Sequence, residues 1–577
     1  MKKKLLPALI VTGLIILVVI IMGITALINK YTPTKKTEDL KEYFNISSDD
    51  EVALIVNNEL SDYKAKIIDK KIYVDYKFVH DSLNSRFYWD ANENVLLYTT
   101  ASDIISAAAD SNSYSVTKQT NDFGYPIVKA TSDSALIALD YVKQYSNITF
   151  KSYDDPARIV ITSKWNEIDS ATVSKPTQVR VKGGIKSPIL KEVKKDDKIT
   201  ILDSGDKWDK VATEDGVIGY IKRKALSESK KTKLTNPDYE EETFTHIKKD
   251  KDICLAWNQV TSQSANSKVP QVISSTKGIN VMSPTWFYLN DNNGNLADIA
   301  SKDYVSYCHS QGIEVWGLFS NLENTDVDAA YVLTHTSTRT TLINQIMSAA
   351  FNYELDGVNI DFENITEAAY GDSYIEFIRE LAIKCHNNGI SLSVDVTVPA
   401  SFNKFFNRSD MAKFADYIVI MGYDEHYKGS DAGSVSSIPW VTEGVESTLK
   451  EVPADQIILG MPFYTRIWEL TPKEDDDAVT DTEDQSKYTV ASQVYSMDAA
   501  AAQLATNNAT AALDEESGQN YAEWSVSNKL YKVWLEDTTS LEKRLKLVDD
   551  NKLAGAAFWK LGFENSSVWD TVIKYLD

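Results

Sequence analysis

The sequence predicts a protein of the α/β class whose C-terminal part, residues 246–577, folds as a TIM (β/α)8 barrel. Two observations carry this prediction. Eight apolar runs of strand length recur along this part of the chain, and helical patterns lie between most of them. Near-continuous apolar strands that alternate with helices indicate a parallel sheet covered on both faces. Eight such units in about 330 residues match a TIM barrel that carries an insertion.

The spacing of the runs predicts where the insertion lies. The interval from about 469 to 531, between the seventh and eighth runs, mixes helix and strand patterns and predicts an α+β insertion that walls the barrel mouth. Helical patterns at 296–312 and 374–389 each end in a glycine, which can close a helix in the left-handed conformation. The predicted strands are residues 253–260, 279–289, 313–322, 355–364, 391–400, 417–426, 456–468 and 553–562.

Composition limits the functions that the chain can have. Its 577 residues are enough for three to four domains. The formal charge of −23 repels phosphate backbones, so nucleic acid is not expected as a partner. A hydrophobic content of 43% argues against a mostly disordered chain. The cysteines, Cys254, Cys308 and Cys385, are too few and too scattered for a disulfide framework and are expected to be small buried residues.

The N-terminus has the features of a membrane anchor, residues 1–29. Lys2, Lys3 and Lys4 precede the uncharged apolar stretch 5–29, which is long enough to cross a bilayer. Its length, and the lack of a small-x-small site after it, favour an uncleaved anchor over the alternative, a cleaved signal peptide. The lysine cluster predicts a cytoplasmic start, a single membrane pass and an extracellular remainder of the chain.

Two small domains are predicted between the anchor and the barrel. After a polar linker at 30–48, residues 49–165 contain two segments, 72–100 and 126–163, with the same order of strand, helix, strand, turn and strand. This pattern resembles the stalk-type repeat named after the N-terminal domain of copper amine oxidases, without copper ligands. The resemblance implies an α+β stalk domain with a spacer or wall-binding role on an exported envelope protein.

Residues 175–227 read as short strands separated by turn signals, followed by a polar linker at 228–245. The stretch 208–220 resembles the core hairpin of a bacterial SH3-like domain, a small β-barrel. Such domains often bind peptidoglycan peptides, so the resemblance implies the cell wall as a partner. Trp208 and Tyr220 are either core aromatics or groove aromatics in this interpretation.

The fourth predicted strand carries the candidate catalytic residues. Since side chains alternate along a strand, Asn359, Asp361 and Glu363 share the inner face of the barrel, with Glu363 nearest the mouth, whereas Ile360 and Phe362 face the helices. Burying carboxylates costs several kcal/mol unless they are paired or protonated, which points to function. The alternative is a hydrogen-bonded core network.

Four motifs in order resemble glycoside hydrolase family 18. The sequence DGVNIDFE (356–363) resembles the signature Asp-x-x-Asp-x-Asp-x-Glu of that family, and MGYD (421–424), MPFYTRIW (461–468) and Trp559 resemble its sixth, seventh and eighth strand motifs. There is one departure: Asn359 stands where the family has its middle Asp. The Asn form is similar to the members that trim bacterial cell wall or spore cortex.

The departure affects the mechanism that the resemblance implies. Proton sharing between two aspartates of one strand cannot operate unchanged with Asn359, although its amide can hydrogen-bond Asp361. The resemblance implies that Glu363 is the acid and that the 2-acetamido oxygen of the substrate attacks the anomeric carbon. Asp361 would orient the acetamide, and Tyr423 would donate a hydrogen bond to its carbonyl. The substrate-binding candidates are Asn359, Asp424, Trp559, Tyr464, Arg466 and Trp286.

The sequence predicts neither a metal nor a cofactor. Its six histidines show no metal-ligand spacing, and no phosphate-cradling loop is found. The acidic stretch 474–484 lacks the glycine of an EF-hand and is expected to be a solvated loop. Trp257, Trp286 and Trp316, near the ends of early strands, either stack sugars or lie in the core.

Three functions remain open at this point. The first is a membrane-anchored N-acetylglucosaminidase that acts on peptidoglycan or its fragments. The second is a chitinase, which would use the same residues. The third is a catalytically silent protein that binds chitin or peptidoglycan, although such proteins usually lose the terminal acid of the signature and Glu363 is present.

Overall fold

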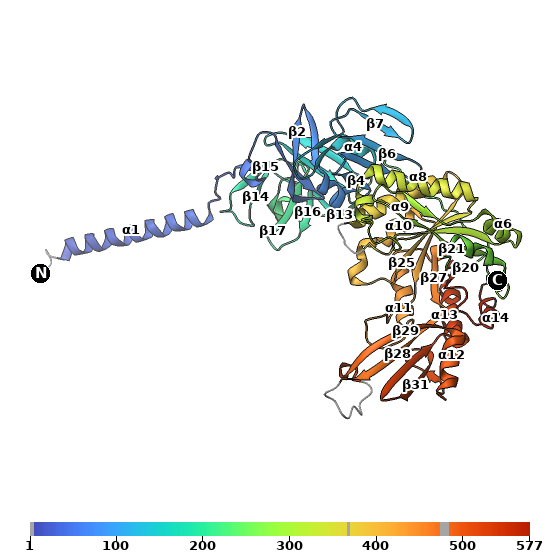
Figure 1. Cartoon of the computed structure of the whole chain (residues 1–577). Coiled ribbons are helices and arrows are strands. Elements are labelled where there is room, and N and C mark those ends of the chain that lie inside the picture. Colours follow the sequence, from blue (N-terminus) through green and yellow to red (C-terminus); the bar gives the residue numbers. More distant parts are fainter. Residues whose placement is uncertain (1–4, 366–369, 474–483, 577) are drawn as a thin grey trace. The chain divides into compact units, whose positions relative to one another are not determined.

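The structure is a computed structural model that describes residues 5–365, 370–473 and 484–576 (Figure 1). The chain forms two compact units. The first contains residues 1–89, 107–114 and 121–241, and the second contains the rest: 90–106, 115–120 and 242–577. Each unit is described by itself.

The chain begins with a long apolar helix, α1 (Leu5–Tyr31). Within it, Pro7–Tyr31 is long and apolar enough to cross a membrane, and none of it is buried. It is the one such helix among the described residues, and a signal sequence near the N-terminus has the same properties. The helix α2 (Leu40–Tyr43) follows it.

A mixed sheet forms the first part of the N-terminal unit, in the order β11-β12-β1-β2-β3-β10-β9. The predicted order of strand, helix, strand and strand occurs twice: as β3, α3 with η1, β4 and β5, and again as β10, α4, β11 and β12. Within this region, residues 90–106, which include β5, and residues 115–120 belong to the second unit. The elements are β1 (Glu51–Val56), β2 (Glu59–Ile68), β3 (Lys71–Asp75), α3 (Tyr76–Phe78), η1 (Val79–Leu83), β4 (Phe87–Asp90), β5 (Val95–Thr99), β6 (Ile104–Ala108), β7 (Ser113–Val116), β8 (Gln119–Asp122), β9 (Val128–Ala130), β10 (Ala135–Ala138), α4 (Leu139–Gln144), β11 (Thr149–Tyr153) and β12 (Arg158–Thr162).

The second part of this unit is an antiparallel sheet in the order β15-β14-β18-β17-β16-β13-β19. The predicted hairpin is formed by β17 and β18, with Trp208 opposite Lys222 and Tyr220 opposite Lys210. Both aromatic side chains are half-buried. The elements are β13 (Glu167–Thr172), β14 (Thr177–Arg180), β15 (Ile189–Val193), β16 (Lys198–Asp203), β17 (Trp208–Thr213), β18 (Ile218–Lys222), η2 (Arg223–Ala225) and β19 (Lys230–Lys233).

The second unit contains the predicted barrel. Eight parallel strands follow one another around it, and pairing of the first with both the second and the last closes the ring. Each of the eight predicted runs contains one barrel strand, which confirms the TIM-barrel prediction. The strands are β20 (Ile253–Asn258), β21 (Val281–Leu289), β23 (Glu314–Ser320), β24 (Gly357–Asp361), β25 (Ser391–Thr397), β26 (Tyr417–Met421), β27 (Ile457–Pro462) and β33 (Gly555–Trp559).

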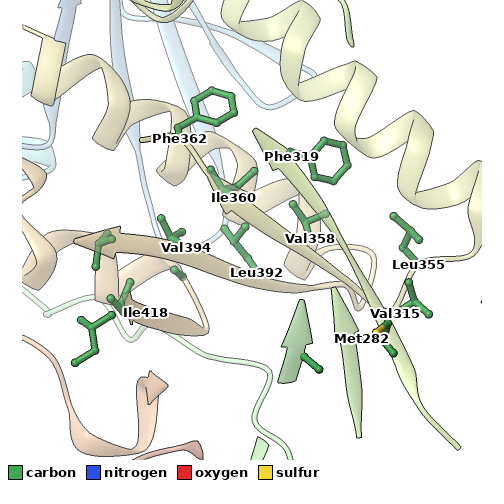
Figure 2. Close-up of a cluster of buried hydrophobic side chains, with 14 of the residues drawn as sticks. Met282, Val315, Phe319, Leu355, Val358, Ile360, Phe362, Leu392, Val394 and Ile418 are labelled. Atoms are coloured by element: carbon green, nitrogen blue, oxygen red, sulfur yellow. The ribbon is translucent and has the colours of Figure 1, made fainter. Parts of the chain in front are cut away.

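Alternation along β24 divides its side chains between two cores. Val358, Ile360 and Phe362 belong to the apolar layer between strands and helices, where Figure 2 shows them with Phe319 and Val394. Asn359 and Asp361 point the other way, into the barrel. The barrel interior contains a separate apolar cluster: Ile253, Leu255, Trp257, Val281, Trp316, Leu318, Tyr417, Val419, Ile458 and Ala557.

The outer layer is helical. The helices α6 (Lys302–Ser310) and α9 (Gly371–His386) end just before Gly312 and Gly389, whose φ angles of +74° and +69° confirm the predicted stops. The predicted helix 296–312 starts later, because β22 (Leu296–Asp298) pairs antiparallel with β21. The other helices are η3 (Gln263–Lys268), α5 (Val269–Ile273), α7 (Ala329–Thr334), α8 (Thr336–Tyr353), η5 (Ser401–Phe406), α10 (Arg408–Phe414), α11 (Ile438–Thr448), η6 (Ala454–Gln456), α13 (Thr538–Asn551) and α14 (Val568–Val572).

The insertion before the last strand has the predicted α+β character, but it starts earlier than predicted. The run 456–468 is two strands, because β27 ends at Pro462 and β28 (Tyr464–Pro472) pairs within a different sheet, β29-β28-β32-β31-β30. Most of the acidic stretch, residues 474–483, lies outside the described residues. The further elements are η7 (Gln485–Lys487), β29 (Tyr488–Ser496), α12 (Met497–Thr506), β30 (Ala512–Asp514), β31 (Gln519–Val526) and β32 (Lys529–Leu535).

We predict that the stability of the barrel depends strongly on Gly555, which lies on the strand that closes the ring. Its φ is +153°, and a Cβ atom there would lie 2.0 Å from the carbonyl oxygen of Ile253 on the neighbouring strand. We expect Gly555→Ala to lower the free energy of unfolding by about 3 kcal/mol or more, because backbone must move to admit the methyl group. Chemical denaturation followed by tryptophan fluorescence measures this.

Gly562→Ala is the matched control for that measurement. Gly562 also has a positive φ, +85°, but no atom of the described residues other than its chain neighbours lies within 4 Å of its added Cβ. We therefore expect Gly562→Ala to lower the free energy of unfolding by only about 1 kcal/mol, the ordinary cost of the left-handed conformation. Equal losses in the two variants would contradict the role of the Gly555 contact.

Candidate active site

Asn359 lies at the centre of a buried polar network inside the barrel. Its Nδ2 donates to Ser393 Oγ at 3.1 Å and to Asp395 Oδ1 at 2.7 Å. Its Oδ1 accepts from Trp257 Nε1 at 3.0 Å and from Ser283 Oγ at 2.9 Å. Since a tryptophan N–H can only donate, it fixes which way the amide points. All four hydrogen-bonding positions of the amide are used.

This network corrects one prediction and weakens another. The sequence led us to expect a hydrogen bond from Asn359 to Asp361, and that prediction is wrong, because both amide hydrogens go to the neighbouring strand β25. Asn359 is also fully buried, so its placement does not support direct contact with a substrate. It fits the hydrogen-bonded core network that we considered as the alternative.

Asp361 does not fit such a network. Its side chain is buried on the inner face of β24, and its Oδ1 has no hydrogen-bond partner within the described parts of the chain. Burial raises the pKa of Asp361 well above its ordinary value, and repulsion from Asp395, Glu363 and Glu323 raises it further. A buried acceptor without a donor costs free energy that a ligand N–H can recover.

Glu363 follows β24 at the carboxyl end of the strand, as predicted, and the residue is exposed there. Its pKa is raised above the ordinary value by partial loss of hydration, and also by repulsion from Asp424 and Glu323. A carboxyl group that stays protonated closer to neutral pH and can be reached from solvent has the properties of a general acid.

Asp424, Tyr464 and Arg466 come together as one polar cluster. Tyr464 Oη donates to Asp424 Oδ1 at 2.6 Å, and Arg466 Nη2 lies 3.6 Å from the same oxygen. Burial raises the pKa of the Tyr464 phenol, and the Asp424 carboxylate raises it further. Arg466 and Tyr464 both lie on β28, so the insertion supplies two of the three predicted residues.

An aromatic group stands beside the carboxylates. The ring of Trp257 lies 6.4 Å from that of Tyr423 and 5.9 Å from that of Trp559, both edge-on. Tyr423 and Trp559 are half-buried, which leaves part of each ring accessible. Burial raises the pKa of the Tyr423 phenol well above its ordinary value, with Asp361 and Asp395 adding to the shift, so Tyr423 is a hydrogen-bond donor.

Trp286 lies apart from these residues. It is fully buried in the outer layer, where its Nε1 donates to Asn266 Oδ1 at 2.8 Å and its ring packs edge-on against Tyr304. The alternation of β21 gives it the outer face of the strand. This placement does not support the prediction that Trp286 binds substrate.

Sequence reasoning missed several members of the site: Asp395, Ser393, Ser283 and Glu323. A signal was present for Asp395, because it is the only charged residue in the apolar run 391–400 and shares a face with Ser393. Glu323 lies just beyond β23 and accepts from Ser320 Oγ at 2.7 Å. The sequence gives no sign that it faces Glu363.

The comparison with protein families decides the class of the barrel. The model of "Glycosyl hydrolases family 18" matches residues 316–564, a segment that contains β24, Glu363, the aromatic group's Tyr423 and Trp559, and the insertion. This chain carries a glycoside hydrolase family 18 domain. The predicted class of enzyme, a glycosidase, is thereby confirmed.

Relatives within this family are distant. The uncharacterized glycosylase YvbX of Bacillus subtilis (strain 168) is 24% identical over 302 residues, which cover 49% of this chain and 81% of that protein. The cortical fragment-lytic enzyme of the same organism is 24% identical over 287 residues, or 48% of this chain and 63% of that enzyme. The C-terminal domain of a candidate chitinase from Desulfitobacterium hafniense DCB-2 has the same fold, with a TM-score of 0.50, 18% identity, and coverage of 57% of this chain and 100% of that domain.

The buried network predicts a pH-dependent penalty for the family's usual residue at position 359. Asn359→Asp replaces a donor to Asp395 by a third carboxyl group, whose folded-state pKa will be raised for the reasons that raise those of Asp361 and Asp395. A group with a raised folded-state pKa stabilises at low pH and loses this contribution as the pH rises. We expect a loss of about 3 kcal/mol in unfolding free energy at pH 8 and a smaller loss at pH 5.

Denaturant unfolding at the two pH values measures this difference. Ser283→Ala is the control, because it removes an uncharged partner of Asn359 and its cost should not depend on pH. If Asn359→Asp lowers the free energy of unfolding by the same amount at both pH values, the new carboxyl group is not held protonated.

Proposed function

We propose that the chain is a membrane-anchored extracellular glycosidase that cleaves β-1,4 bonds at N-acetylglucosamine in peptidoglycan or its fragments, with retention of configuration. The observation that carries the proposal is the pair Asp361 and Glu363 at the carboxyl end of β24 in a family 18 barrel, both with a raised pKa. Retained Glu363 argues against a silent sugar-binding protein.

The reaction needs a proton on the leaving oxygen, and Glu363 supplies it. In this family the nucleophile belongs to the substrate, whose 2-acetamido oxygen attacks the anomeric carbon as the leaving group departs. The unpartnered Asp361 Oδ1 accepts the acetamide N–H and stabilises the positive oxazolinium ion. The Tyr423 phenol donates to the acetamide oxygen. Glu363 then takes a proton from the water that opens the intermediate.

This mechanism restricts the substrate to sugars with an N-acetyl group. Trp559, half-exposed beside Tyr423, provides a face for stacking a sugar ring. The cluster of Asp424, Tyr464 and Arg466 adds polar groups that can hydrogen-bond the glycan. Peptidoglycan is favoured over chitin because one relative is named a cortical fragment-lytic enzyme, and chitinase remains the second candidate.

The proposed location is based on the N-terminal part of the chain. The exposed apolar helix α1 behind three lysines fits an anchor whose start stays in the cytoplasm. The SH3-like resemblance of residues 175–227 and the stalk resemblance of 49–165 support contact with the cell wall. Together they support the proposal that the barrel lies outside the membrane, where peptidoglycan is found.

Replacing the proposed acid gives the direct test. We expect Glu363→Gln to lower hydrolysis of peptidoglycan fragments by about a thousandfold, because the amide N–H is far too weak an acid to protonate the leaving oxygen. Purified full chain is incubated with peptidoglycan, cortex muropeptides and chitin oligomers, and products are identified by mass spectrometry. Glu446→Gln, on the exposed face of α11, is the control that should remain active.

The products also separate the candidate functions. Cleavage of chitin oligomers alone would assign the chain as a chitinase. Binding without cleavage by the unaltered chain, unaffected by Glu363→Gln, would assign a sugar-binding protein.

A second prediction concerns the anchor. The full chain should fractionate with membranes and resist alkaline extraction, because the apolar span partitions into the bilayer core. A variant that starts at residue 32 should appear in the soluble fraction. Release of the full chain into the medium, shortened after α1, would instead identify a cleaved signal peptide.

A further inference from the structure

A second buried carboxyl group inside the barrel has no role in the mechanism above. Asp395 lies on β25, the strand beside β24, and is 3% exposed. The parallel register sets Asn359 opposite Ser393, so two residues further along Asp361 lies beside Asp395. Both side chains point into the barrel, and neighbouring strands are only about 4.8 Å apart.

Nothing around this pair neutralises two negative charges. Within the described residues, neither Asp361 nor Asp395 forms an ion pair with a lysine, arginine or histidine. Among the residues that the structure describes, the one polar contact of Asp395 is the 2.7 Å hydrogen bond that its Oδ1 accepts from Asn359, and Asp361 Oδ1 has none. Two adjacent carboxyl groups removed from water cannot both be ionised at moderate cost, so one of them holds a proton.

We propose that Asp361 and Asp395 share a single proton and that Asp395 is a positioning residue, which holds this proton whenever Asp361 acts as a carboxylate. The proposal rests on the proposed function, because it gives the negative charge of the pair a place in that reaction. The hydrogen bond from Asn359 occupies Asp395 Oδ1 and leaves Oδ2 to carry the proton.

The proton balance is closed within the pair. When the acetamide N–H of the substrate reaches Asp361, the shared proton moves from the Asp361 carboxyl to Asp395, and the pair keeps one proton and one negative charge. That charge now lies on Asp361, beside the oxazolinium ion that forms as Glu363 protonates the leaving oxygen. When water opens the ion and Glu363 regains its proton, the shared proton returns to Asp361.

Four other titratable groups interact electrostatically with the pair. They are the carboxyl groups of Glu363 and Glu323 and the phenols of Tyr374 and Tyr423. Burial raises the pKa of both phenols well above the ordinary value, so they stay neutral. Burial also raises the pKa of each aspartate, and neighbouring carboxyl groups raise it further.

Asp395→Asn in the full chain, purified in detergent, tests the proposal. The variant keeps an acceptor for Asn359 but has no site for the proton, so the charge stays on Asp361 throughout. We expect kcat to fall at least about tenfold without a rise in KM. A permanently charged Asp361 stabilises the bound substrate as much as the transition state, so it no longer lowers the barrier between them. The acidic limb of kcat/KM should move to lower pH, since Asp361 has lost its like-charged neighbour.

Ser393→Ala is the matched control. It removes an uncharged partner of Asn359 from the same strand, so it should leave the pH profile in place. An unchanged pH profile in Asp395→Asn, or the same shift in both variants, overturns the proposal.

A measurement without substrate keeps this test independent of the proposed function. A folded-state pKa above the unfolded value contributes stability at low pH that is lost as the pH rises through the folded-state value. Asp395→Asn and Asp361→Asn each remove one member of the pair. The Tm of each variant minus the Tm of the unaltered chain should therefore be more positive at pH 8 than at pH 5.

Thermal unfolding of the three full-length proteins at both pH values decides the point. Equal Tm differences at pH 5 and pH 8 in both variants would show that no proton is shared, even if the enzyme is active. The predicted pH dependence in a chain that cleaves no glycan would show that the pair shares a proton and that the proposed function is wrong.

Discussion

A single buried amide links half of the strands of the barrel. Asn359 on β24 binds Trp257 on β20, Ser283 on β21, and Ser393 and Asp395 on β25. These contacts cross the interior rather than the sheet, so they hold the four strands at one level of the barrel. The proposed catalytic residues, Asp361 and Glu363, lie further along the same face of β24. Their position therefore depends on a network that is buried from solvent.

The fold was predictable because each barrel strand is a nearly continuous apolar run, buried on both faces. The inner and outer faces of β24 were predictable too, since alternation depends only on the sequence of one strand. Two features needed partners from elsewhere. The run 456–468 divides at Phe463 because β27 pairs with β33 and β28 pairs with β29 and β32. The role of Asp395 depends on the register between β24 and β25.

Trp286 shows a different limit. Alternation along β21 puts Trp286 on the same face as Met282, in the layer between strands and helices. Because most residues of the run 279–289 are apolar, its sequence does not say which of the two faces points to the helices. Aromatic residues near strand ends were therefore candidates for stacking a sugar, and the structure assigns Trp286 to the outer layer.

The unit that contains the barrel also includes residues that sequence patterns do not assign to it. Residues 90–106 group with the barrel, although their pattern continues the predicted stalk. Asp90 Oδ2 accepts hydrogen bonds from the amide and hydroxyl groups of Thr336, and Thr99 Oγ1 donates to Glu376 Oε1. These contacts join residues 246 and 277 positions apart. Pairings at such separations leave no periodic signal.

Asn359, where the family signature has an aspartate, can be understood from its hydrogen-bond partner Asp395. With an aspartate at 359, the inner face of β24 and β25 would carry three carboxyl groups, and no lysine, arginine or histidine among the described residues pairs with Asp361 or Asp395. Asn359 reduces them to two and supplies a donor to Asp395. The pair now lies across two neighbouring strands, whose backbones are about 4.8 Å apart, rather than along one strand, where successive residues of one face are about 6.6 Å apart. A closer pair repels more strongly, so it retains one proton over a wider range of pH.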